Sequence, residues 1–112
     1  MFGFQRLDVY RCAIEFLGLV SSILKRIPRG HAALADQLRR AALSVPLNIA
    51  EGSGKTDRDN ARFYTIARGS ALECAAILDV VEVLGFVSAP EIAQPRQLLE
   101  RVVSMLTKLR EA

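Results

Sequence analysis

Apolar residues recur every three or four positions along most of this 112-residue chain, which is the spacing of an amphipathic α-helix. The pattern breaks at 28–30, at 52–54 and at 85, where proline and glycine favour turns. The spacing therefore predicts four helices, at about 7–27, 32–51, 56–85 and 88–109. Connections this short favour antiparallel neighbours. The expected fold is all-α, an antiparallel up-down-up-down four-helix bundle that residues 1–112 form as a single domain.

Local signals refine two of these helices. Thr56 with Asp59, and Ser88 with Glu91, have the spacing of a capping box at a helix N-terminus. Pro95 lies within the last helix, where proline removes a backbone hydrogen bond and clashes with the preceding turn. We therefore expect a short first turn there, followed by a main helical segment from about 95 to 109.

The first helix has an apolar surface wider than one bundle groove requires. One seam is flanked by apolar residues on both sides. The seam residues are Leu7, Tyr10, Ile14, Leu17 and Leu24, and the flanking residues are Val9, Ala13, Phe16, Val20, Ile23 and Ile27. A helix needs a single stripe to face its own bundle, so the extra width indicates a second burial surface on another subunit. Phe16 and Ile23 are the predicted interface residues.

Polar residues interrupt the second and third helices. At helical spacing one stripe of the second helix holds Gln37, Arg40, Ser44, Asn48 and Glu51, and Ser70 and Glu73 interrupt the third. Two interpretations fit this pattern. In the favoured one, Arg40 or Arg39 pairs with Glu73 or Glu51, Arg40 with buried Glu73 being the first choice, and Ser44, Asn48 and Ser70 complete a structural polar network. In the other, the carboxylates and arginines form an active site, although such sites usually add a histidine or a third close carboxylate.

Three segments carry a more specific signature, namely QLRRA at 37–41, SVPLNIAEG at 44–52 and IARGSALE at 66–73. This pattern resembles the bacterial four-helix-bundle family encoded in intervening sequences of 23S rRNA genes, also called S23, and the resemblance covers nearly the whole chain. It extends to the accessory proteins of diversity-generating retroelements, which share the fold, form five-fold rings and bind nucleic acid and a reverse transcriptase. The resemblance implies that the protein is a homo-oligomer, with a pentamer as the expected form. It also implies that this oligomer acts as a ribonucleoprotein accessory protein.

Charge is unevenly distributed along the chain. The formal net charge is +3, yet residues 25–68 hold nine bases and four acids. Any attraction to phosphate would be concentrated on this segment, and a ring would repeat it. The candidate nucleic-acid-binding residues are Lys55, Arg58, Arg62 and Arg68, with Arg29 and Lys25 if the bundle brings those loops to the same surface.

Other site types have weaker support. Cys12 and Cys74 have no spaced partners for zinc or a disulfide framework, so neither a metal nor a cofactor is expected. The sequence GSGKT at 52–56 resembles the end of a nucleotide-binding loop, but the leading glycine is replaced by Ile49 and a helix precedes it where a strand is required. The N-terminus lacks the order of a signal peptide and the apolar runs are broken by charge, which predicts a cytoplasmic protein without a membrane partner.

Three functional classes remain. The first is a non-enzymatic, homo-oligomeric protein that binds RNA or DNA. The second is an adaptor ring that contacts a partner enzyme such as a reverse transcriptase and does not itself bind nucleic acid. An enzyme comes third, because no nucleophile with its base, metal cluster or complete nucleotide loop can be named.

Overall fold

The structure, a computed structural model, describes residues 1–112 and contains no strand. Its elements are the 3-10 helices η1 (Gly3–Arg6) and η2 (Arg29–His31) and the α-helices α1 (Asp8–Arg26), α2 (Ala32–Ser53), α3 (Asp57–Val83) and α4 (Ala89–Glu111). The predicted all-α fold with four long helices is confirmed, with boundaries close to those expected. None of the helices combines the length and hydropathy that a bilayer-spanning segment requires.

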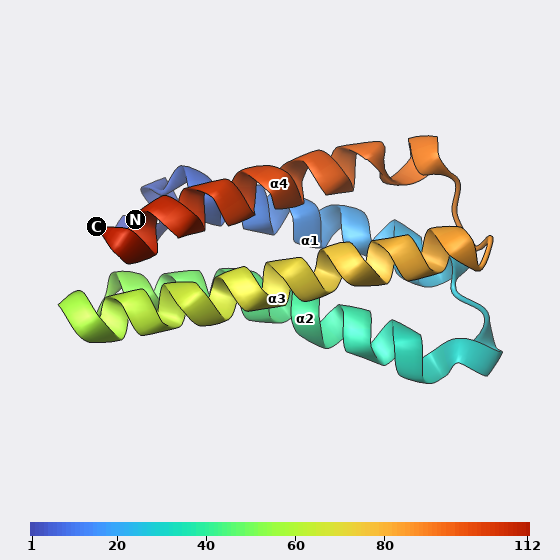
Figure 1. Cartoon of the computed structure of the whole chain (residues 1–112), viewed down its shortest axis with the longest axis horizontal. Helices are drawn as coiled ribbons and strands as arrows, with labels where there is room; N and C mark the ends of the chain where they lie inside the picture. Colours follow the sequence, from blue (N-terminus) through green and yellow to red (C-terminus); the bar gives the residue numbers. More distant parts are fainter.

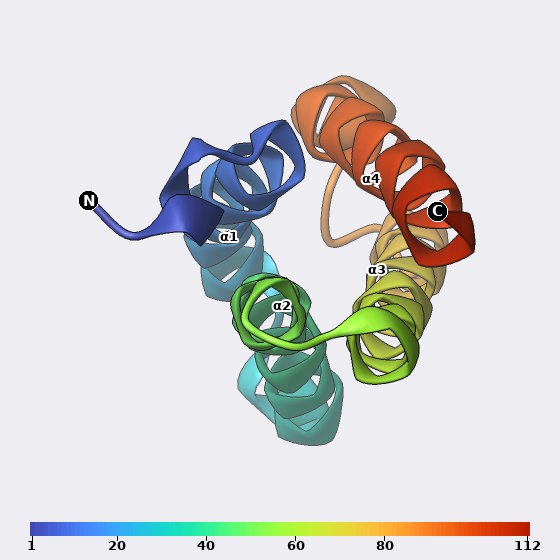
Figure 2. The ribbon, with the colours of Figure 1, turned by 90° about the vertical axis from the view of Figure 1, so that its left-hand side faces the viewer.

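The four helices occupy the corners of a square when the molecule is viewed along its length (Figure 2). α1 and α3 are diagonal, and each packs against both α2 and α4. Both chain termini and the α2–α3 connection lie at one end of the molecule, hereafter the terminal end (Figure 1). The α1–α2 and α3–α4 connections lie at the other end, hereafter the distal end. Residues far apart in the sequence therefore meet at each end.

One apolar cluster of 25 buried residues fills the centre, and no polar or charged residue is fully buried. α1 contributes Phe16, which is 0% exposed, together with Val9, Val20 and Ile23. The prediction that Phe16 and Ile23 form a subunit interface is wrong, because both side chains are packed inside their own bundle. The seam that includes Tyr10, Ile14 and Leu17 is half-buried or exposed. The sequence showed the width of the apolar surface correctly but not which side faces inward.

α4 continues through Pro95 as one helix, so the expected separate first turn is wrong. Pro95 is buried, as is Pro46 inside α2. Each proline forgoes one backbone hydrogen bond, and the apolar contacts of its ring on the inner face of the helix offset that loss.

The two predicted capping boxes have different outcomes. Glu91 Oε1 accepts a hydrogen bond from the backbone amide of Ser88 at 2.9 Å, which confirms the capping box of α4. Thr56 is the residue before α3, but its side chain makes no capping hydrogen bond. There the first turn is closed by the backbone alone, with the Asn60 amide donating to the Thr56 carbonyl at 3.1 Å.

α2 and α3 approach each other closely where α2 ends. A Cβ added to Gly52 would lie 2.9 Å from Phe63 Cβ and 3.1 Å from two ring atoms of Tyr64. Phe63 Cβ is attached directly to the backbone and cannot swing away. Asn60 Nδ2 also donates to the Gly52 carbonyl at 2.9 Å, which fixes the start of α3 against the end of α2. Only glycine fits at position 52 without a shift of α3.

We predict that Gly52→Ala lowers the free energy of unfolding by about 1–3 kcal/mol, because the new methyl group overpacks the α2–α3 contact. Urea denaturation monitored by circular dichroism measures this change. Gly54→Ala is the matched control, since its Cβ would make an ordinary contact at 3.7 Å from the Glu51 carbonyl oxygen. Equal losses in the two variants would show that close packing at Gly52 is not the cause.

Stability should also depend on the charge of Glu91. The hydrogen bond from the Ser88 amide, together with the Ser88 side chain and Arg26, lowers the pKa of Glu91 below its ordinary value. A carboxyl whose folded pKa is lowered stabilises the folded state when ionised, so this contribution is present at neutral pH and is lost as the pH falls below the ordinary carboxyl range near about 4. Glu91→Gln should therefore lower the Tm at pH 7, and the difference from wild type should shrink in acid. Glu100→Gln, on the same helix, is the control. A Tm difference that persists unchanged at low pH would contradict the role of the carboxylate.

Candidate nucleic-acid interface

Three members of the predicted polar network meet between α2 and α3. Ser44 Oγ lies 2.7 Å from Ser70 Oγ, which joins the two helices. Asn48 Nδ2 donates to the carbonyl oxygen and to Oγ of Ser44, at 2.8 and 2.9 Å. These half-buried groups satisfy one another, so this part of the polar stripe fixes how α2 and α3 pack.

The charged members of that network do not join it. Glu73 is exposed and accepts a hydrogen bond from Gln37 Nε2 at 3.1 Å. Arg39 and Arg40 instead pair with Asp36, at 3.6 and 3.1 Å. The predicted burial of Glu73 and its pairing with Arg40 or Arg39 are therefore wrong. The physical reason is local, because Asp36 lies one helical turn before both arginines and is within reach of each.

The remaining carboxylate of the network, Glu51, is exposed and takes part in no ion pair. No group of three or more His, Cys, Asp or Glu side chains is arranged to hold a metal ion. Glu51 and Glu73 thus lack the histidine or third close carboxylate that active sites of this type usually add.

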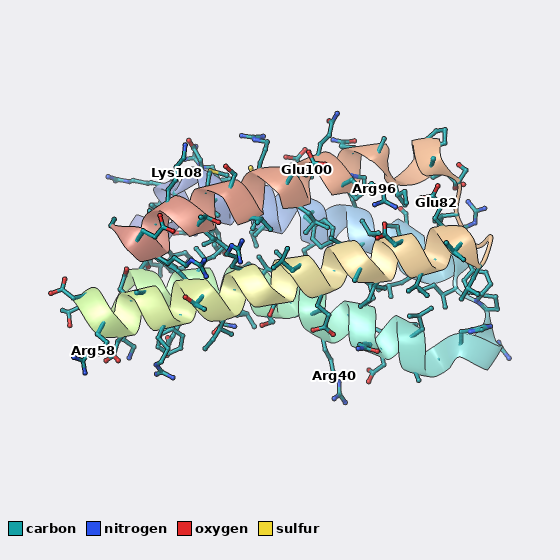
Figure 3. The ribbon with its side chains drawn as sticks, in the orientation of Figure 1. Arg40, Arg58, Glu82, Arg96, Glu100 and Lys108 are labelled. Carbon is teal, nitrogen blue, oxygen red and sulfur yellow. The ribbon has the colours of Figure 1, made fainter.

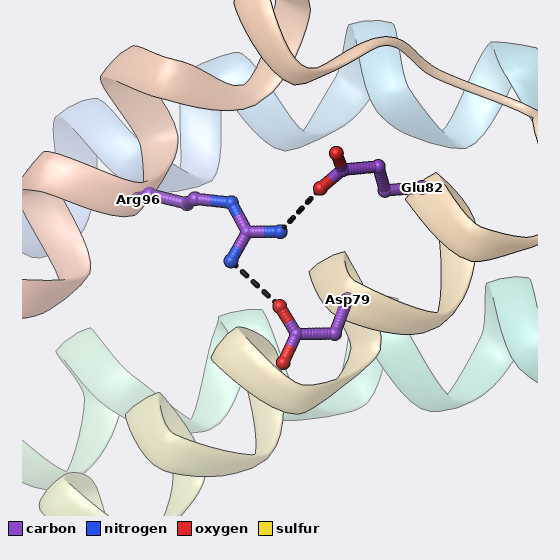
Figure 4. A network of polar contacts seen from close by, with 3 residues as sticks. All are labelled: Asp79, Glu82 and Arg96. Carbon is purple, nitrogen blue, oxygen red and sulfur yellow. Dashed lines mark hydrogen bonds and ion pairs between the residues drawn. The ribbon is translucent and has the colours of Figure 1, made fainter.

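All five ion pairs lie in the distal half of the bundle. Arg96 of α4 donates to Asp79 Oδ1 at 2.7 Å and to Glu82 Oε1 at 2.8 Å, both on α3 (Figure 4). The hydrogen bond that Arg96 donates to Asp79, and then the one it donates to Glu82, raises the pKa of Arg96 above its ordinary value. Arg26 pairs with Glu91 between α1 and α4. The distal bases that face neighbouring helices are thus largely neutralised.

The terminal end has the opposite character. Lys55, Arg58 and Arg62 are exposed there, and none takes part in an ion pair. Bases from the two chain ends lie at the same end of the molecule and also lack an ion pair; Figure 3 labels Arg58 and Lys108 at this end. We call the group Arg6, Arg11, Lys55, Arg58, Arg62, Lys108 and Arg110 the terminal-end bases. Sequence reasoning missed four of them because they fall outside the basic segment at 25–68, and only the fold brings both chain ends to the α2–α3 connection.

Two of these cations are held against an aromatic ring. Arg62 Cζ lies 4.8 Å from the centroid of the Phe63 ring, and Lys55 Nζ lies 5.9 Å from it. The negative face of the ring attracts both charges. These contacts hold Lys55 and Arg62 against the same ring without an anion, and they leave the donors of both side chains free to bind one.

The other three predicted contact residues lie elsewhere. Arg68 is half-buried and donates from Nε to Thr107 Oγ1 at 2.8 Å, so it faces α4. Lys25 and Arg29 lie at the distal end, and the 22 residues of α2 separate that end from Lys55 by roughly 33 Å at 1.5 Å per residue. The condition that the bundle brings these loops to one surface is not met.

Neither the GSGKT segment nor the cysteines form a reactive site. Gly52 and Ser53 belong to the last turn of α2, and Gly52 is packed against α3, so no open phosphate loop exists at 52–54. Cys12 and Cys74 are both buried free thiols. Burial raises the pKa of Cys74 to about 12, which keeps it protonated and unreactive.

Comparisons with known proteins identify one family. The family model described as 23S rRNA-intervening sequence protein matches residues 5–108. A comparison with curated proteins gives no significant match.

Proposed function

Because the chain belongs to the 23S rRNA-intervening sequence protein family, we propose that it is a non-enzymatic ribonucleoprotein accessory protein. In this proposal an antiparallel four-helix bundle assembles into a homo-oligomeric ring of five copies and binds RNA or DNA without sequence specificity. The observation that carries the proposal is the group of terminal-end bases that take part in no ion pair. The number five rests on the resemblance to the accessory proteins of diversity-generating retroelements.

Phosphate binding accounts for the separation of charge along the bundle. Unpaired arginines and lysines attract the phosphate backbone and release counterions when they bind it. Asp57 and Asp59 lie in the first turn of α3, where their negative charges interact favourably with the helix dipole. The same charges reduce the net positive charge of the terminal end. One subunit would therefore bind weakly. Several copies in one ring raise the effective concentration of contacts and convert weak binding into useful affinity.

Assembly is supported by two unlike apolar surfaces. The first, the α3 outer face, comprises Thr65, Ile66, Gly69, Leu72, Ala76, Val80 and Val83, all of them exposed. The second, the α1–α2 outer face, comprises Tyr10, Ile14, Leu17, Leu24, Leu43 and Leu47, which are exposed or half-buried. Val83 is 85% exposed and Leu47 is 64% exposed, so both protrude from the subunit. Contact between two unlike faces is head-to-tail, and such contacts generate a ring when the rotation closes.

Gly69 is a further sign of a partner on α3. It lies in the middle of a 27-residue helix, where glycine costs about 1 kcal/mol relative to alanine. A Cβ at this position would meet nothing within 4 Å in the subunit, so internal packing does not require glycine. Close approach by a helix of a second copy does explain its presence.

The alternative is an adaptor ring whose charged end contacts a partner enzyme such as a reverse transcriptase, without direct binding of nucleic acid. The same unpaired bases would then meet acidic side chains of that enzyme. Direct binding of nucleic acid separates the two proposals.

We predict that the purified protein binds structured RNA, single-stranded DNA and duplex DNA at low salt, with affinity falling steeply as salt rises. The pair Arg58→Glu and Arg62→Glu should abolish binding and leave the oligomer intact. Lys25→Glu with Arg29→Glu is the matched control, since it makes the same change in charge at the distal end and should weaken binding only slightly. Fluorescence anisotropy over a salt series, with light scattering for mass, gives both readouts. Failure of the wild-type protein to bind all three probes at low salt would favour the adaptor ring.

We predict that Leu47→Glu and Val83→Glu each prevent ring assembly, because each variant loses one of the two unlike faces. A mixture of the two variants should give a dimer, since the intact α3 outer face of one can still pack on the intact α1–α2 outer face of the other. Light scattering at micromolar concentration measures each mass. Gln97→Glu, on the exposed side of α4, is the control and should assemble normally. A wild-type monomer would overturn the ring, and a mixture that stays monomeric would overturn the head-to-tail contact.

A further inference from the structure

A hollow lined with aromatic residues lies beside the terminal-end bases. η1 folds back against the end of α2, and a hollow of ≈ 570 Å³ remains between them. Its walls are Phe2, Gly3, Phe4 and Leu7 from the N-terminal segment, Ala50, Ser53 and Gly54 from the α2–α3 connection, and Tyr64 from α3. A volume of this size falls in the range of small-ligand sites, about 300–1,000 Å³, and accommodates a nucleobase with its sugar.

The phenylalanine rings that line the hollow stack on one another, and the outer ring is exposed to solvent. Phe2 is 73% exposed, and its ring stacks on that of Phe4 with centroids 5.8 Å apart and planes 7° apart. Phe4 in turn packs edge-on against Tyr10 at 4.9 Å. An exposed phenylalanine held flat against a second ring offers a free π-face, which is the surface on which single-stranded nucleic acids stack their bases.

One residue that lines the hollow, Tyr64, also has a hydroxyl without a hydrogen-bond partner within the chain. Tyr64 is only 4% exposed, yet its hydroxyl makes no hydrogen bond to another group of the protein. Since no fully buried side-chain oxygen or nitrogen lacks a partner, this hydroxyl has access to solvent, and Tyr64 lines the hollow. A donor and acceptor at that place can bond to the edge of a base, whose edges carry both donors and acceptors.

Basic residues adjoin the residues that line the hollow. Lys55 directly follows Gly54 of its wall, and Arg6 ends η1. Arg11 Nε donates to the Gln5 carbonyl at 3.1 Å, which ties this guanidinium to the same segment. An apolar, aromatic hollow with Arg6 and Lys55 next to its lining residues complements a nucleobase attached to a phosphate backbone better than it complements an uncharged apolar peptide.

We propose that this hollow receives an unpaired base of single-stranded RNA or DNA, stacked on Phe2 and Phe4, while Lys55 and Arg6 contact the adjoining phosphates. The inference rests on the proposed binding of nucleic acid and adds a preference for single strands. In a duplex the faces of the nucleobases are already stacked on one another and cannot enter the hollow. A duplex can therefore contact only the arginine and lysine side chains of the terminal-end bases.

The test compares a labelled single-stranded 12-nucleotide oligomer with a duplex of the same length by fluorescence anisotropy at fixed low salt. Wild type should bind the single strand more tightly, and Phe2→Ala should weaken that binding roughly tenfold, the loss typical of one stacked base, without changing duplex binding. Phe2→Trp should restore it. Lys55→Ala should weaken both complexes and lower the salt dependence by about one phosphate contact. Because Phe2 is mostly exposed, its replacement should leave the Tm unchanged.

An abasic version of the single strand isolates the stacking contribution. Wild type should bind the abasic oligomer with no higher affinity than Phe2→Ala binds it. Phe2→Ala should bind the abasic and the normal single strand with equal affinity. Equal binding of single strand and duplex by wild type, or no effect of Phe2→Ala, would overturn the inference and leave the proposed binding of nucleic acid in place. A lower oligomer mass for Phe2→Ala would also overturn it, by showing that a second copy covers the rings. No binding of any probe by wild type would overturn both.

Discussion

Close approach of α2 and α3 is the constraint on which the rest of the molecule depends. Small residues line this contact, with Gly52 at its terminal end and the hydroxyls of Ser44 and Ser70 2.7 Å apart in its middle. Because a Cβ at position 52 would collide with Phe63, the observed spacing between the end of α2 and the start of α3 requires glycine there. That spacing places Tyr64 in the wall of the hollow and directs Lys55 and Arg62 toward the Phe63 ring.

The two ends of the bundle differ in whether their charged side chains form ion pairs. In the distal half, carboxylates of one helix meet bases of the same or a neighbouring helix, as Arg96 does with Asp79 and Glu82. These contacts are mostly exposed and contribute little to stability one by one, but they pair Arg26, Arg39, Arg40 and Arg96, whereas Lys25 and Arg29 stay unpaired. At the terminal end the bases have no such partners. The ion pairs of this fold are thus confined to the distal half, while the terminal-end bases have none.

Apolar residues of the chain are found both in the core and on the outer surface of α3. The inner faces of all four helices close one core, yet α3 still exposes Leu72, Val80 and Val83 on its outer side. Exposed charges on α3 between 65 and 84 are limited to Glu73 and Asp79, and each already has a partner, Gln37 and Arg96 respectively. An apolar outer surface of this extent is more typical of an interface than of a helix that faces water.

The sequence by itself determined the helices and the family, because a 3.6-residue apolar period, glycine and proline breaks and the polar signature at 37–73 are all properties of local order. It also contained the pairing of Asp36 with Arg39 and Arg40, which follows from their spacing and was overlooked in favour of a longer-range pair. Only the tertiary structure decided that Phe16 faces inward and Ile14 outward, since a wide apolar surface does not specify which side meets the bundle. Likewise, only the folded chain could bring Arg6 and Lys108 to the end that holds Lys55 and carry Lys25 to the other. The direction in which each helix runs sets those positions, and direction depends on packing between segments that are remote in the sequence.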